Sequence, residues 1–85
     1  MRLTIKYFAS IRETVGVSEE VVHVDADSLT VDSLKQWLAQ TRPALQDAFS
    51  DDRPVRVAVD HAVQHSAFPL LDGSEIAFFP PVTGG

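Results

Sequence analysis

Cysteine is absent from the 85 residues, and glycine occurs only four times. Without cysteine the chain has no disulfide, no thiolate metal site and no thiol nucleophile, so sulfur chemistry would need a group other than a side-chain thiol. The glycines leave no phosphate-cradling loop and no dinucleotide fingerprint; they are Gly16, Gly73, Gly84 and Gly85. None of the serines lies in a context typical of a catalytic triad.

Long apolar runs and an excess of positive charge are also missing. No apolar run approaches the roughly 20 residues of a membrane span. The first residues, 1–6, lack the apolar core of a signal peptide, so we expect a cytoplasmic protein. The formal net charge of −5 disfavours nucleic acid and anionic membrane as partners and favours a basic surface on another protein.

Apolar periodicity predicts a single α+β domain over residues 1–79, followed by a flexible tail, 80–85. The expected strands cover residues 3–7, 20–24, 55–59, 63–65 and 75–79, and the expected helical segments cover 9–16, about 30–42 and 45–49. The longest helix has Thr30 as its N-cap, an apolar stripe with Trp37 at the core edge, and Pro43 after its end. This order predicts a sheet covered on one face by one main helix.

Three apolar side chains do not fit this core. By the alternation of their strands, Phe8 and Phe79 point away from it, and Val63 lies on the short edge strand. A large aromatic side chain buries about 150–250 Å² when it is covered. Apolar residues gathered on a surface therefore predict a docking site for a partner. The alternative, that loops or a second layer cover them, remains open.

Two groups of polar residues are interpreted as having no catalytic role. Asp60, His61 and His65 come closest to a set of metal ligands, but they fall in a turn and an edge strand, so we expect no functional metal. The acidic residues near the second strand are interpreted as a solvated surface; they are Glu19, Glu20, Asp25 and Asp27.

The chain ends on Phe78-Phe79-Pro80-Pro81-Val82-Thr83-Gly84-Gly85. The two prolines cannot continue a sheet and favour an extended backbone. The last two residues have no Cβ, so their backbone can enter a narrow channel. From Pro80 onward the tail spans up to about 20 Å. This end predicts that the carboxylate of Gly85 is delivered to the active site of another protein.

In these features the chain resembles the small subunit of molybdopterin synthase, a family of sulfur carriers with the ubiquitin-like β-grasp fold. The resemblance covers residues 7–13, 30–34, 57–59 and, most specifically, 71–85. One departure is Asp60-His61, where the family more often has asparagine after the strand. The resemblance implies a mixed sheet of about five strands with one main helix packed on one face.

The resemblance also implies how the tail is used. Gly85 would be adenylated with ATP by a ubiquitin-activating-like adenylyltransferase and converted to a thiocarboxylate by a sulfur donor system. It would then give sulfur to cyclic pyranopterin monophosphate, forming the dithiolene of molybdopterin. The segment that would insert into the large synthase subunit is Pro80, Pro81, Val82, Thr83 and Gly84. That subunit would supply the catalytic side chains, in a heterotetramer of two small and two large subunits.

By position, Phe8, Val63 and Phe79 match the apolar contact surface of the family. No cofactor is expected to stay bound to this chain, because ATP would be consumed on the activating enzyme. Three alternatives stay open: a related β-grasp carrier for thiamine or cysteine synthesis, a ubiquitin-like modifier joined through Gly85 to lysines, and an interaction module with an inert tail.

Overall fold

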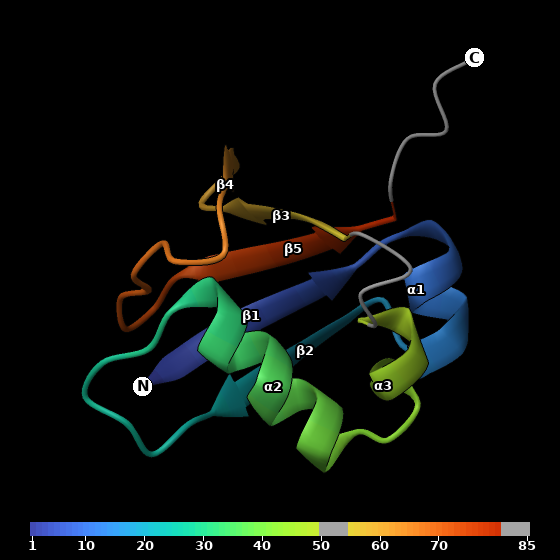
Figure 1. Cartoon of the computed structure of the whole chain (residues 1–85), viewed down its shortest axis with the longest axis horizontal. Coiled ribbons are helices and arrows are strands. Elements are labelled where there is room, and N and C mark those ends of the chain that lie inside the picture. The colour runs from blue at the N-terminus through green and yellow to red at the C-terminus, as the bar shows by residue number, and fades with distance from the viewer. Residues whose placement is uncertain (50–54, 81–85) are drawn as a thin grey trace.

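The computed structural model describes residues 1–49 and 55–80, in which three helices lie beside a five-stranded sheet (Figure 1). The strands are β1 (Arg2–Tyr7), β2 (Glu19–His23), β3 (Arg56–Val59), β4 (Ala62–Gln64) and β5 (Glu75–Phe79). The helices are α1 (Ala9–Val15), α2 (Val31–Thr41) and α3 (Leu45–Ala48). All the predicted elements are present, with ends shifted by a few residues at most.

The sheet has the strand order β2-β1-β5-β3-β4. β1 and β5 lie parallel in its middle, and every other neighbouring pair is antiparallel. In Figure 1, α2 lies in front of one face of the sheet, and α1 and α3 lie at the end where β1 and β5 finish. A mixed five-stranded sheet with its helices on one face confirms the predicted β-grasp fold.

The alternation of apolar residues places one face of the sheet in the core, as predicted. Leu3 and Ile5 of β1 and Ile76 and Phe78 of β5 are fully buried. The helices and their flanks cover this face with Ile11, Val31, Leu34, Leu38 and Leu45. The Trp37 ring lies half-buried at the edge of the core, also as predicted. Burial of a large apolar side chain is worth about 1.5–3 kcal/mol, so the packing of this face is strongly stabilising.

Local signals set the ends of the helices. Thr30 caps α2, because its Oγ1 accepts a hydrogen bond from the amide of Ser33 at 3.1 Å. Such a cap contributes about 1 kcal/mol. α1 ends at Gly16, whose φ of 91° is a left-handed conformation that glycine adopts without a steric cost. None of the three helices in the described ranges is long and apolar enough to cross a membrane.

Asp60 and His61 form the turn between β3 and β4, as predicted. Both have positive φ values, 48° and 76°, which is the backbone of the tightest antiparallel hairpins. The Asp60 carboxylate also accepts a hydrogen bond from the amide of Glu75 at 2.9 Å. Aspartate tolerates the left-handed conformation as asparagine does, so the departure from the family pattern leaves the turn intact.

Candidate tail-docking surface

Among the residues that the structure describes, no helix lies on the second face of the sheet, and a cross-strand row of side chains runs through all five strands on that face. The register aligns Val63 with Ala58, Ala58 with Ala77, Ala77 with Lys6, and Lys6 with Glu19. Aligned residues on neighbouring strands share a face of the sheet. The row is therefore apolar toward β4 and charged toward β2.

Phe8 and Phe79 form a stacked pair at the end of this face where β5 finishes. Their ring centres are 4.6 Å apart and their planes differ by 11°. Phe8 is 40% exposed and Phe79 is half-buried. The amide of Phe8 donates a hydrogen bond to the carbonyl of Phe78 at 3.1 Å, which holds the two strand ends together. The outward orientation predicted for both rings is confirmed, and each ring partly covers the other.

Val63 projects from the edge strand β4 and is 67% exposed. Between it and the aromatic pair lie Ala58 and Ala77, which are buried although they belong to the same face. Small side chains between larger ones leave a shallow apolar surface. We call Phe8, Phe79, Ala77, Ala58 and Val63 the docking strip. The structure brings the three predicted contact residues onto one face, whereas their contact with a partner stays a prediction.

The base of the tail adjoins the docking strip. β5 ends at Phe79, and the half-buried Pro80 follows outside the strand. The other residues predicted to insert into a partner, Pro81, Val82, Thr83 and Gly84, and the reactive Gly85, lie outside the described residues. The tail therefore begins at Pro80, directly after Phe79 of the stacked aromatic pair.

A half-buried ion pair lies on the core side of the sheet, beside the end of β1. Glu20 Oε2 accepts hydrogen bonds from the Tyr7 hydroxyl at 2.6 Å and from Arg42 Nε at 2.7 Å, and Oε1 pairs with Arg42 Nη2. The prediction that Glu20 belongs to a solvated surface is therefore wrong, since its side chain is only 20% exposed. Its register partner is the buried Ile5, which turns it inward.

Opposing effects set the charge of this cluster. Burial alone would raise the pKa of Glu20, but hydrogen bonds from Arg42 and Tyr7, together with the Arg42 charge, hold that pKa below its ordinary value. Burial and the hydrogen bond to Glu20 raise the pKa of Tyr7, so its phenol stays protonated. The hydrogen bond to Glu20 raises the pKa of Arg42. The cluster therefore ties β1, β2 and the end of α2 together as an ion pair.

Replacement of Glu20 by Gln is expected to lower the free energy of unfolding by about 1.5–3 kcal/mol at neutral pH, because Tyr7 and Arg42 lose a charged acceptor. The folded-state pKa of Glu20 lies below its unfolded value, 4.5. Its contribution is therefore present above that value and is lost as the pH falls through the folded-state pKa. Urea unfolding at a series of acidic pH values should show a steeper loss in the wild type than in Glu20→Gln. Glu13→Gln, an exposed change on α1, serves as the control. Parallel pH profiles for wild type and Glu20→Gln would contradict this account.

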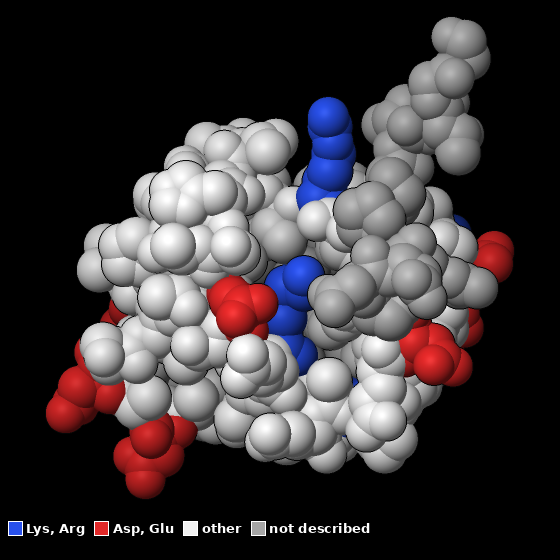
Figure 2. Space-filling view, viewed as in Figure 1, with Lys and Arg blue, Asp and Glu red and all other residues white. Residues whose placement is uncertain are grey.

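Charges of both signs lie on the helix-covered side of the molecule. Figure 2 shows acidic side chains mostly toward the rim of this side, an acidic and a basic side chain next to each other near its middle, and another basic side chain projecting at its upper edge. Lys35 of α2 lies here, with Nζ 5.6 Å from the centre of the Phe49 ring. This side therefore presents a mixed charge pattern rather than a surface of one sign.

Comparison with known proteins places the chain in a family. The model of the ThiS family matches residues 5–85. The chain belongs to the ThiS family. It is 39% identical to the molybdopterin synthase sulfur carrier subunit of Escherichia coli (strain K12), over 98% of this chain and 99% of that protein. The resemblance to the small subunit of molybdopterin synthase is thereby confirmed.

Some proteins similar to this chain are named as protein modifiers rather than as sulfur carriers. The chain is 32% identical to small archaeal modifier protein 3 of Haloferax volcanii, with both proteins covered in full. The crystal structure of SAMP1 from Haloferax volcanii matches with a TM-score of 0.81 and 31% identity, again over the whole of both chains. Proteins named as carriers and as modifiers thus share this fold, and the fold alone does not separate the two roles.

The residues considered as metal ligands, Asp60, His61 and His65, make other contacts in this chain. His61 Nδ1 lies 3.7 Å from a Glu75 oxygen, and His65 Nδ1 accepts a hydrogen bond from the amide of Ala67 at 3.2 Å. Within residues 1–49 and 55–80, no three His, Asp or Glu side chains are grouped so that they could hold a metal ion.

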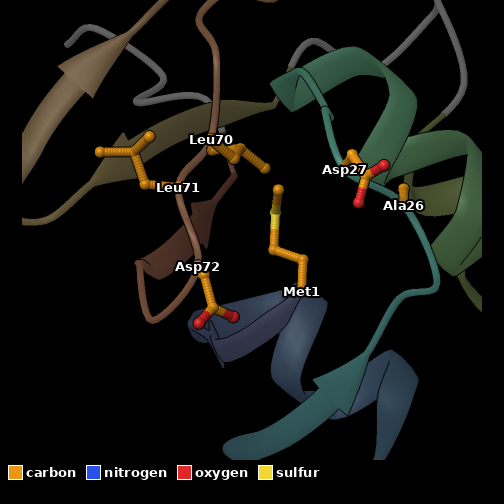
Figure 3. Close-up of a pocket in the computed structure, with 6 residues that line it drawn as sticks. All are labelled: Met1, Ala26, Asp27, Leu70, Leu71 and Asp72. Carbon is orange, nitrogen blue, oxygen red and sulfur yellow. The ribbon is translucent and has the colours of Figure 1, made fainter.

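A pocket of about 350 Å³ opens beside Met1, at the start of β1 (Figure 3). Figure 3 shows the Met1 side chain between Leu70 on one wall and Asp27 on the other. The Met1 amine donates a hydrogen bond to the carbonyl of Val24, and the Asp72 carboxylate accepts one from the amide of Arg2. These contacts hold the start of β1 against the loops around it. We therefore interpret the residues of this pocket as structural rather than as a binding site.

Proposed function

We propose that this ThiS-family chain is the sulfur-carrier subunit of a molybdopterin synthase and that its C-terminal Gly85 carries the sulfur. The main support is the join between the docking strip and the tail: β5 places Phe79 in the strip and continues through Pro80 toward Gly84-Gly85. The Escherichia coli relative that bears this name covers nearly the whole chain.

The chemistry follows from the bonding of the terminal carbonyl carbon. A free carboxylate resists nucleophilic attack, so an activating enzyme first joins Gly85 to the AMP part of ATP and releases pyrophosphate. A sulfur nucleophile then displaces AMP and leaves a thiocarboxylate. A chain without cysteine suits this role, because it offers no side-chain thiol that could capture the activated carbonyl.

The reaction with the pterin needs a second protein. We propose that the docking strip binds the large synthase subunit, so that Pro80 and the residues after it enter a pocket on that subunit. Cyclic pyranopterin monophosphate would be bound there, and the catalytic side chains would come from the partner. A dithiolene contains two sulfurs, so two thiocarboxylates are consumed for each product.

The modifier role is the second candidate, and the 32% identity to small archaeal modifier protein 3 supports it. A modifier would also be adenylated at Gly85, but an amine rather than sulfur would then attack the carbonyl. The product would be an isopeptide with a lysine of a target. Activation is common to the two roles, and the nucleophile that follows distinguishes them.

Intact mass measurement of the chain from cells that contain its activating enzyme tests the proposal. We expect a fraction of the protein to be heavier by the exchange of one oxygen for sulfur, with the difference confined to the C-terminal peptide. The same lysate, after digestion, is searched for Gly85 joined to lysine side chains. Abundant adducts without any sulfur-bearing form would favour the modifier role.

A further inference from the structure

The docking strip has a cation at one end. Arg56 of β3 is the register partner of Phe79, so it lies on the same face of the sheet and directly beside the base of the tail. Its side chain is exposed. A partner that covers Phe79 therefore also meets the guanidinium of Arg56.

The charge at the other end of the same face is negative. Lys6 Nζ lies 3.2 Å from a Glu75 oxygen and 3.8 Å from a Glu19 oxygen, so one ammonium is shared by two carboxylates. The Asp60 carboxylate is next to them, since it accepts the hydrogen bond from the amide of Glu75. Glu75 has the least exposed side chain of these three, 27%, compared with 35% for Lys6 and 54% for Glu19.

We propose that charged residues beside the docking strip determine the orientation in which the large subunit binds. The large-subunit surface then carries a carboxylate opposite Arg56 and a basic side chain opposite Glu75 and Asp60. This inference rests on the proposed function. Apolar contacts alone are non-directional, whereas a partner docked the wrong way round would bring like charges together at both ends.

The two charged contacts act separately. Glu75 and Phe79 are four residues apart on β5, which is about 13 Å along a strand. This exceeds the screening length of about 8 Å at physiological ionic strength. The net charge of the chain predicted a basic partner surface, but the arrangement on this face requires an acidic group on that surface at the entrance of the tail.

The experiment measures binding of the full chain to the purified large subunit at low and at high salt. Arg56→Glu is expected to weaken binding about tenfold at low salt, mainly through slower association, with a smaller difference at high salt. Arg56→Gln should fall between it and the wild type. Glu75→Lys should weaken binding as Arg56→Glu does, and Glu75→Gln should do so less.

Arg2→Glu is the matched control, because it makes the same charge change on an exposed residue of β1 outside the strip. It should leave the affinity within about twofold, as expected for an isolated surface charge. Equal effects of Arg2→Glu and Arg56→Glu would overturn the inference, since only net charge would then matter. If Phe79→Asp abolishes binding while Arg56→Glu binds as the wild type does, only this inference fails. If the wild type does not bind the large subunit, the proposed function itself fails.

Discussion

Removal of Gly85 is expected to abolish sulfur transfer to the pterin while the domain stays folded. The acyl carbon of Gly85 is the atom that the activating enzyme and the sulfur must reach, and the deletion withdraws the chain end by about 3.3–3.6 Å. Misplacement of a reacting group by 1 Å can already cost about 100-fold in rate. We expect the rate of dithiolene formation to fall below detection in an assay with activating enzyme, sulfur donor and large subunit.

Two controls separate chemistry from folding in this deletion. The core residues found in the described ranges all lie between Leu3 and Phe78, so the thermal unfolding curve of the shortened chain should match that of the wild type. Thr83→Ser keeps the length of the tail and should retain most of the activity. Sulfur transfer by the shortened chain would place the reactive group elsewhere and would contradict the mechanism.

Substitutions at the adjacent residues Phe78 and Phe79 are expected to give opposite results. Phe78 is fully buried, with its ring centre 4.9 Å from that of Phe49 and 6.2 Å from that of Tyr7. Phe78→Ala should cost about 3–5 kcal/mol. A domain of this size has about 4–13 kcal/mol in total. Urea unfolding should therefore show a midpoint far below that of the wild type, because a large share of the total stability is lost.

Phe79→Asp should instead leave the domain folded and remove binding to the large subunit. The change forfeits the stacking on Phe8, worth about 0.5–1.5 kcal/mol of stability. A charge placed in the centre of an apolar contact should weaken binding by about 100-fold or more, as for an interface hot spot. Val21→Asp, at a 45% exposed position on β2, is the control and should bind normally. Unfolding of Phe79→Asp would show that this ring belongs to the core.

Alternation was sufficient to predict which side chains face inward. Leu3, Ile5 and Phe78 are buried, and Phe8 and Phe79 point outward, because a period of two along a strand fixes the face of every residue. The helix caps could be predicted equally well, because Thr30 and Gly16 interact with backbone groups only a few residues away. The sequence predicts such features well because each depends on residues close together in the chain.

Contacts between distant segments could not be predicted in this way. Glu20 and Arg42 are 22 residues apart, and nothing local to either residue indicates that they meet. The inward parity of Glu20 was visible, but a lone glutamate on a strand is more often exposed. The antiparallel pairing of β3 with β5 likewise places Arg56 beside Phe79 at the base of the tail, while Glu75 lies at the opposite end of β5. The charge pattern of the docking strip therefore emerged only with the sheet register.

Single-turnover sulfur transfer tests the central claim most directly. Purified chain bearing the thiocarboxylate is mixed with the large subunit and cyclic pyranopterin monophosphate, and both the dithiolene and the intact mass of the chain are followed in time. We predict that two chains revert from thiocarboxylate to carboxylate for each dithiolene formed, at matching rates. Dithiolene formed while the chain keeps its sulfur, or loss of that sulfur without any dithiolene, would contradict the role of this protein as the sulfur carrier.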